Sequence, residues 1–229
     1  MNSDTAAVIL AAGKGRRMGG TNKALMPLNG QPVLSYSVNA FRKSIAIAEV
    51  IVVMNSYDLS RMKQEWGMEP QELGIDKVVD GGEERWLSSL NGVLATHQKQ
   101  KFIMVHDAAR PLITTRDIEK VLNEARKTDA AIAAEPVTDT LKKSSESSKV
   151  SSTLNREKIW KAQTPQAAKR ELLLEAFNHW DAGINGNPTD ESMILENYGH
   201  TPKLVSLNTP NFKLTTSKDV HLAEALIKT

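Results

Sequence analysis

Short apolar runs alternate with amphipathic segments along most of the chain. Five of these runs are compact and bounded by turn residues, which is typical of buried strands; they cover residues 6–10, 50–54, 77–79, 102–105 and 130–134. Between them, apolar residues recur at helical spacing over residues 32–43, 57–66, 85–97 and 114–128. This alternation predicts an α/β fold built on a doubly wound, mostly parallel sheet.

The alternation breaks between Pro136 and Pro165. The centre of this stretch, residues 141–150, is polar and rich in serine, and its flanks, 138–142 and 150–154, are able to pair as a two-stranded ribbon. Composition alone is equally compatible with a disordered surface loop. Because an isolated ribbon is marginal in water, we expect it to pack against something else, such as another subunit.

Ordinary elements resume after this stretch. They are a helix over 169–180, a helix from Glu191, a strand over 203–207 and a C-terminal helix from Ser217. The sequence has no internal repeat and no linker that would separate two domains. We therefore expect a single domain over residues 1–229, with an arm at about 136–165.

Composition narrows the class of protein. The chain has 229 residues, 40% of them hydrophobic, and a formal net charge of only +2, which argues against a nucleic-acid partner. Cysteine is absent, and the five histidines show no spacing typical of metal ligands. The N-terminus lacks the pattern of a signal peptide, and no apolar run approaches the ~20 residues of a membrane span. We expect a cytoplasmic protein with no membrane partner.

A glycine-rich turn, Ala11–Met18, follows the first predicted strand directly. Ligands of open parallel sheets bind outside the carboxyl ends of strands, where glycines let backbone N–H groups approach phosphate. Arg16, Arg17 and Lys23 add positive charge, so the pattern favours a polyphosphate site. A plain tight turn with solvated basic side chains is the alternative. Met18, in place of the third glycine, argues against a nicotinamide-dependent dehydrogenase.

Two further turns follow predicted strands. In His106–Pro111, Asp107 is placed to hold Mg²⁺ near phosphates, and Arg110 to contact a second phosphate. The alternative is an aspartate–arginine pair that only caps the strand. In Asp80–Arg85, glycines and the nearby Ser88 are suited to reading a base, although an ordinary glycine turn into a helix explains the same residues.

These motifs, taken together, resemble the 2-C-methyl-D-erythritol 4-phosphate cytidylyltransferase family. The matching pieces follow the family's order and span nearly the whole chain: Ala11–Met18, Lys23, Gly81–Arg85, His106–Pro111, Pro136–Thr140, Trp160–Gln166, Thr189–Glu191 and Asn211–Thr215. The resemblance implies a Rossmann-like nucleotidyltransferase fold and a homodimer whose arm reaches the partner. It also implies transfer of CMP from CTP to 2-C-methyl-D-erythritol 4-phosphate, a sugar-alcohol phosphate, in the non-mevalonate pathway of isoprenoid precursor synthesis.

The resemblance also implies roles for particular residues. CTP would contact a set around the glycine-rich turn: Ala11, Ala12, Gly13, Gly15, Arg16, Lys23, Gly82, Arg85, Ser88 and Ala108. The acceptor would contact a second set: Asp107, Arg110, Thr140, Arg156, Thr164 and Lys213. The catalytic set would be Arg16, Lys23, Asp107 and Lys213. Asp107 would be the Mg²⁺ ligand.

The chain departs from the family pattern at a few positions. Asn22 stands where proline is frequent, Ala24 where glutamine is common, Thr138 where a basic residue is frequent, and Asn155 where aspartate is usual. Thr138 and Asn155 lie near the acceptor side, so ribitol 5-phosphate is the alternative acceptor. A non-catalytic nucleotide sensor is disfavoured because the four catalytic positions keep their polar side chains.

Overall fold

A seven-stranded sheet organises residues 3–13 and 22–227, the part of the chain that the computed structural model describes. The strand order is β11-β7-β10-β6-β1-β4-β5. The strands are β1 (Thr5–Leu10), β4 (Ile47–Val53), β5 (Lys77–Val79), β6 (Phe102–Asp107), β7 (Ala130–Pro136), β10 (Trp160–Lys169) and β11 (Lys203–Ser206). All neighbours pair in parallel except β10, which is antiparallel to β6 and β7.

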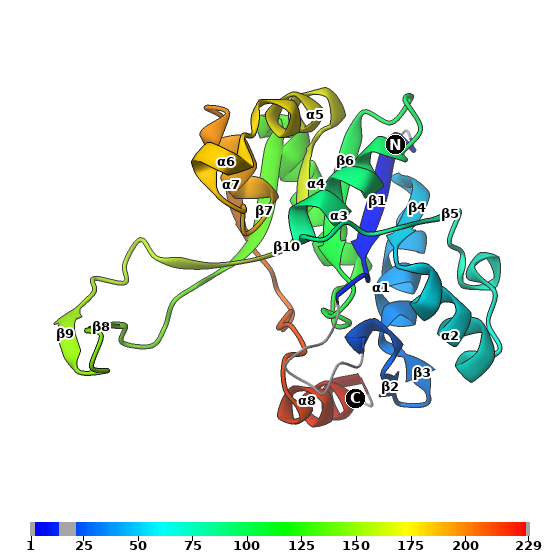
Figure 1. Cartoon of the computed structure of the whole chain (residues 1–229), viewed down its shortest axis with the longest axis horizontal. Helices are drawn as coiled ribbons and strands as arrows, with labels where there is room; N and C mark the ends of the chain where they lie inside the picture. The colour runs from blue at the N-terminus through cyan, green and yellow to red at the C-terminus, as the bar shows by residue number, and fades with distance from the viewer. Residues whose placement is uncertain (1–2, 14–21, 228–229) are drawn as a thin grey trace.

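Helices cover both faces of this sheet (Figure 1). One face packs against α1 (Val33–Arg42), α2 (Ser56–Trp66) and α4 (Thr115–Thr128), and the other against α3 (Arg85–Leu94), α5 (Arg170–His179) and α7 (Glu191–Asn197). Within β1, Ala7 and Ile9 belong to the first core, whereas Ala6 and Val8 belong to the second. Burial on both faces explains why the strands are continuous apolar runs. The predicted fold class is confirmed.

Strand β10 is the main element that the sequence pattern did not predict. It begins inside the stretch where the alternation of strands and helices breaks and continues to Lys169, and it contains Pro165, a residue that has no N–H for a sheet ladder. The structure accommodates the proline in a bulge: Ala162 pairs with Ala134 and Gln166 with Ile132, so three residues of β10 lie between these pairs. A bulge re-aims side chains, and here it matters for the site.

Smaller elements complete the described structure. They are the 3₁₀ helices η2 (Lys23–Leu25) and η3 (Pro70–Leu73), the hairpin of β2 (Pro27–Leu28) and β3 (Gln31–Pro32), and helices α6 (Ala182–Asn185) and α8 (Ser217–Ile227). The C-terminal α8 packs beside the hairpin through a separate apolar cluster of Leu28, Val33, Leu214 and Ala223. No helix within residues 3–13 and 22–227 is long and apolar enough to cross a bilayer.

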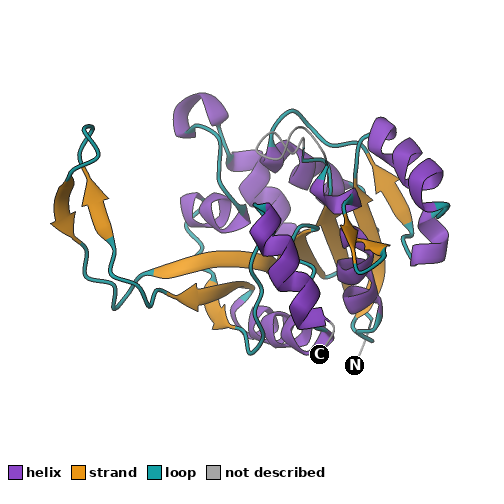
Figure 2. Ribbon diagram, turned by 90° about the horizontal axis from the view of Figure 1, so that it is seen from below, coloured by secondary structure: helices purple, strands orange, loops and turns teal. Residues whose placement is uncertain are grey.

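An arm projects from the β7–β10 side of the molecule (Figures 1 and 2). Its tip is an antiparallel ribbon of β8 (Lys142–Ser144) and β9 (Val150–Thr153), extended by the hydrogen bond from Leu154 N–H to the Leu141 carbonyl. The ribbon rather than the disordered loop is therefore what the chain forms. All residues from 142 to 158 are exposed, including Val150 at 66%. Docking of the arm on a partner stays a prediction.

Candidate active site

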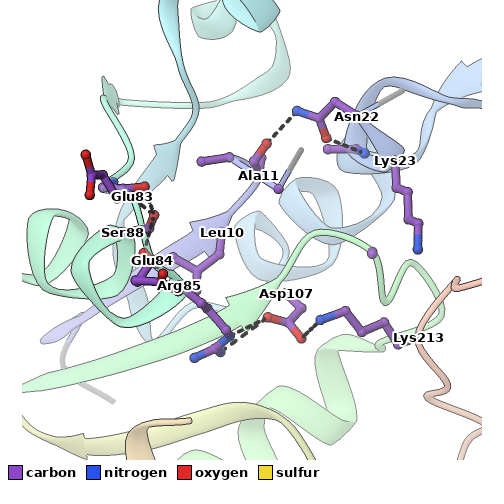
Figure 3. Close-up of a pocket in the computed structure, with 15 residues that line it drawn as sticks. Leu10, Ala11, Asn22, Lys23, Glu83, Glu84, Arg85, Ser88, Asp107 and Lys213 are labelled. Carbon is purple, nitrogen blue, oxygen red and sulfur yellow. Dashed lines mark hydrogen bonds and ion pairs between the residues drawn. The ribbon is translucent and has the colours of Figure 1, made fainter. Parts of the chain in front are cut away.

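A pocket of about 460 Å³ opens at the carboxyl edge of the parallel strands (Figure 3). Its walls come from the ends of β1 and β6, from the turn after β5, and from Lys213 near the C-terminus. The lining residues are Leu10, Ala11, Ala12, Gly13, Asn22, Lys23, Ala24, Gly82, Glu83, Glu84, Arg85, Ser88, Asp107, Ala109 and Lys213. The described part of the glycine-rich turn, Ala11–Gly13, and the turns after β5 and β6 thus face one cavity, as the carboxyl ends of parallel strands should.

Asp107, at the end of β6, lies between three cationic side chains. Its Oδ1 is 3.2 Å from Arg85 Nη2. Its Oδ2 is 2.8 Å from Lys213 Nζ and 3.8 Å from Arg110 Nε. Burial would raise the pKa of Asp107, but attraction to Arg85 and Lys213 outweighs burial and holds that pKa well below its usual range. The carboxylate is therefore ionised at neutral pH.

Arg85, the first residue of α3, bridges Asp107 to Glu191, the first residue of α7. Its Nη1 donates to Glu191 Oε1 at 2.8 Å, and its Nη2 donates to Glu191 Oε2 at 3.2 Å. Burial would lower the pKa of Arg85, but the two carboxylates raise it above its ordinary value. The guanidinium therefore fixes the orientation of Asp107, and its predicted contact with CTP stays a prediction.

His106 and Thr164 support the backbone beneath Asp107. His106 Nε2 lies 3.2 Å from the Arg110 carbonyl oxygen, so this nitrogen carries the proton and Nδ1 is the acceptor. Thr164 Oγ1 then donates to His106 Nδ1 at 3.1 Å and accepts from Asp107 N–H at 3.0 Å. Burial lowers the pKa of His106 to about 4, so the ring is neutral at pH 7. The bulge in β10 is what delivers Thr164 to this position.

The turn after β5 brings its backbone close to the pocket wall. Gly82 N–H donates to Ser88 Oγ at 3.0 Å. A Cβ added at Gly81 would lie 2.5 Å from Ala12 Cβ, and one at Gly82 would lie 2.3 Å from Leu87 Cβ. Both positions therefore require glycine, and this wall offers backbone and hydroxyl groups to a ligand.

The segment that carries Lys213 is tied to the loop after β6. Arg110 Nη1 donates to the Asn211 carbonyl at 2.7 Å, and Leu214 N–H donates to the Ala109 carbonyl at 2.8 Å. Within the described part of the chain, Arg110 Nε and Asn211 Oδ1 are buried without a hydrogen-bond partner. Burial also lowers the pKa of Arg110. These bonds place Lys213 beside Asp107, although the two are far apart in sequence.

The predicted site residues fall into four groups. Those that line the pocket are Ala11, Ala12, Gly13, Lys23, Gly82, Arg85, Ser88, Asp107 and Lys213. Ala108, Arg110 and Thr164 lie behind this lining, whereas Thr140 and Arg156 lie on the arm and do not line the described pocket. Gly15 and Arg16 lie outside the described residues.

Sequence reasoning gave no site role to Asn22 or Glu191. Asn22 lines the pocket, and Glu191 holds Arg85 from a position 106 residues away. A signal was available for Glu191, because it lies in the Thr189–Glu191 motif that carried part of the resemblance. Asn22 was noted only as a departure from the family pattern.

Known proteins of one family are similar to this chain over nearly its whole length. Residues 5–229 match the family described as 2-C-methyl-D-erythritol 4-phosphate cytidylyltransferase. The protein of that name from Alkaliphilus oremlandii is 38% identical over 232 residues, covering 99% of this chain and 96% of the relative. The one from Lachnoclostridium phytofermentans is 37% identical over 224 residues, covering 97% and 95%.

Solved structures are similar over the same length. The 4-diphosphocytidyl-2C-methyl-D-erythritol synthase of Anaerococcus prevotii superposes with a TM-score of 0.82 at 26% identity, with full coverage of both chains. The 2-C-methyl-D-erythritol 4-phosphate cytidylyltransferase of Thermus thermophilus gives 0.78 at 28% identity, covering 97% of this chain and 98% of that one. Sequence and fold therefore point to the same group of proteins.

Proposed function

Because this chain belongs to the 2-C-methyl-D-erythritol 4-phosphate cytidylyltransferase family, we propose that its pocket is where CMP passes from CTP to 2-C-methyl-D-erythritol 4-phosphate. The chain is a CTP-dependent cytidylyltransferase of the non-mevalonate pathway to isoprenoid precursors. The products are 4-diphosphocytidyl-2-C-methyl-D-erythritol and pyrophosphate. The observation that carries the assignment to this pocket is Asp107, an ionised carboxylate held by Arg85 and Lys213 at the strand ends.

The reaction joins two anions. A phosphate oxygen of the acceptor attacks the α-phosphorus of CTP, the new P–O bond forms, and the bond to the departing pyrophosphate breaks. The acceptor phosphate is already ionised at neutral pH, so no general base is needed. The obstacles are charge repulsion and alignment, which fixed cations and a preorganised pocket reduce.

The side chains divide these tasks by position. Lys23, on the wall near Ala11, faces the space assigned to the triphosphate, and Arg16 is predicted to act with it. Lys213 and Arg110 lie around Asp107, where the acceptor is assigned. The backbone of Gly82 and the hydroxyl of Ser88 form the wall assigned to the nucleoside.

Mg²⁺ is compatible with this set of residues. Asp107 supplies a carboxylate at the pocket, a type of ligand that Mg²⁺ prefers. No cluster of three metal-ligating side chains occurs among residues 3–13 and 22–227. That matches the way Mg²⁺ is held by one or two carboxylates together with substrate phosphates. Asp107 would therefore hold the ion, which when bound neutralises charge on the phosphoryl oxygens.

We assign the arm a role in the pocket of a second copy of the chain. Thr140 and Arg156 are exposed on it, and Arg156 Nη1 donates to the Thr138 carbonyl, which holds one edge of the guanidinium. A guanidinium is well suited to a phosphate. In a two-fold homodimer, each arm would complete the acceptor side of the partner's pocket.

Pyrophosphate release tests the function. The protein is assayed with each of the four ribonucleoside triphosphates against 2-C-methyl-D-erythritol 4-phosphate and ribitol 5-phosphate. We expect release only with CTP, and far faster with the methylerythritol acceptor. A preference for ribitol 5-phosphate would mean that this compound is the acceptor. CTP binding without release of pyrophosphate would indicate a nucleotide sensor.

A further inference from the structure

Helix α2 contributes no residue to the lining of the pocket in the described part of the chain. It nevertheless contacts both ends of η2, the single 3₁₀ turn that carries Lys23. Such a short turn has little stability of its own, because runs of this kind have poor hydrogen-bond geometry. The position of Lys23 must therefore be set from outside the turn.

At the first end of η2, Asn22 uses its whole amide group. Its Oδ1 accepts from Ala24 N–H at 3.0 Å, which caps η2. Its Nδ2 donates to the Ala11 carbonyl at 2.6 Å and to Asp58 Oδ2 at 2.7 Å. Figure 3 shows the link from Asn22 to Ala11. Because Asn22 is only 4% exposed, water cannot easily replace these bonds.

Asp58 is the fixed point of this arrangement. It lies in the first turn of α2, where the helix dipole favours a negative charge, and it is only 6% exposed. Its Oδ2 accepts a second amide bond, from Asn55 Nδ2 at 2.8 Å, and its backbone N–H donates to Asn55 Oδ1. The carboxylate is thus held by the helix N-terminus and presents one oxygen to Asn22.

At the other end of η2, the last residue of α2 makes a second contact. Trp66 Nε1 donates to the Leu25 carbonyl at 3.2 Å. Between these two points, Met62 of α2 is buried in the same core as Ala24 and Leu25. Hydrogen bonds from α2 therefore hold the turn at both ends: Asp58 acts at its start through Asn22, and Trp66 acts at its end.

We propose that Asp58 and Trp66 are positioning residues that brace η2, and so set Lys23 and the Ala11 backbone for the nucleotide. This inference rests on the proposed function, since it concerns the CTP side of the same pocket. It predicts an effect that is selective for CTP, because α2 has no contact with the Asp107–Lys213 side among the bonds described above.

The test is steady-state kinetics with CTP and 2-C-methyl-D-erythritol 4-phosphate varied in turn. Asp58→Ala should raise the KM for CTP roughly tenfold, the scale of a hydrogen bond to a charged group. Trp66→Phe, which keeps the ring but loses its N–H, should raise it by about threefold. The KM for the acceptor should stay within about twofold in both. Asp58→Asn should behave nearly as the wild type, because an amide oxygen can still accept from Asn22.

Asp117→Ala is the matched control. Asp117 is a buried carboxylate in the first turn of α4, and it accepts from Asn208 N–H, but it lines no part of the described pocket. The substitution should lower the melting temperature without a selective rise in the KM for CTP.

If Asp58→Ala does not fold, the result with Trp66→Phe tests the proposal. An unchanged KM for CTP, or an equal rise for both substrates, in an active and folded variant overturns the brace. Absence of CMP transfer in the wild type would instead overturn the proposed function.

Discussion

Asp107, Lys23 and His106 show three ways in which single residues shape this pocket. Asp107 is ionised because cations outweigh its burial. His106 is neutral because nothing outweighs its burial. Lys23 reaches the pocket from η2 and donates to the Thr215 carbonyl at 3.3 Å. Each state follows from the neighbours of the residue, and each leads to a measurable expectation.

Lys23→Ala should lower kcat roughly a hundredfold or more, because it removes a preorganised cation that faces charge developing at the transition state. Pyrophosphate release measures the effect. Lys63→Ala, which removes a surface lysine of α2 paired with Glu69, is the control and should leave kcat unchanged. Near-normal turnover in a folded Lys23→Ala protein would contradict the role.

Chelation tests the predicted ion at Asp107. Activity should be lost in EDTA and return with Mg²⁺, because both substrates bring phosphate oxygens to a carboxylate. The measurement is turnover before and after metal is restored. Full activity in chelator would leave Lys23, Lys213 and the arginines as the sole cations that offset the phosphate charge.

His106 should make stability depend on pH. Its pKa is about 4 in the folded chain, below its ordinary value of ~6.5, so the unfolded chain binds the proton first. The stabilisation is complete above pH 6.5 and is lost as the pH falls from 6.5 toward 4, by roughly 3 kcal/mol. Urea unfolding in EDTA between pH 7 and pH 5 should show about 2 kcal/mol of this loss, since roughly 1.5 of the roughly 2.5 pH units lie in that range.

A His106→Gln variant is the control for that titration. Glutamine cannot titrate in this range, so the unfolding free energy of the variant should fall less steeply as the pH falls. The difference between the two slopes should correspond to the uptake of about one proton on unfolding. Equal slopes in the two proteins would show that His106 does not titrate as expected.

At the scale of elements, α3 lies close against the sheet at Gly92. At Gly92, an added Cβ would lie 2.3 Å from Val8 Cγ1 of β1 and 2.8 Å from Val53 Cγ2 of β4. The helix can approach this closely only without a side chain there. Because Arg85 begins the same helix, this close approach also fixes where the guanidinium meets Asp107 and Glu191.

Gly92→Ala should therefore destabilise the protein by about 1–3 kcal/mol, the usual cost of overpacking a core. Denaturant unfolding measures the free energy. Leu94→Ala, at a position of the same helix that is 59% exposed, should change it by less than ~0.5 kcal/mol. A neutral or stabilising Gly92→Ala would mean that α3 shifts without cost.

At the scale of the whole molecule, the arm stands apart from the domain that carries the pocket. Its ribbon is exposed along its length and projects away from the sheet (Figure 2). Thr140 and Arg156, which flank the ribbon in sequence, are exposed and do not line the described pocket. An exposed ribbon of this kind gains stability from a partner surface. The predicted homodimer provides one.

Mixed dimers test this arrangement. Lys23→Ala and Arg156→Ala proteins should each be nearly inactive, the second chiefly through weaker acceptor binding. If the arm acts on the partner's pocket, a mixed dimer has one site with both defects and one with neither. Activity should then return after subunit exchange, toward about half that of the wild type per mixed dimer, by the symmetry of a two-fold pair. Verified mixed dimers without recovered activity would place the arm's residues in their own subunit's site.

The sequence by itself determined the class of fold and the edge of the sheet where the site lies. Strands that are buried on both faces appear in the sequence as continuous apolar runs. The carboxyl ends of parallel strands lie together at one edge of the sheet. The glycine-rich turn, Asp107 and Gly82 each follow such a run, so their meeting could be predicted. Lys213 and Thr164 came only with the family resemblance.

Only the tertiary structure decided the contacts that hold these groups in place. Glu191 meets Arg85, and Asp58 meets Asn22, across 106 and 36 residues of sequence. Strand β10 forms despite Pro165 because a bulge takes the proline out of the ladder and directs Thr164 toward His106. Local pattern reports which face of an element is buried, whereas the packing of distant elements fixes which polar groups meet there.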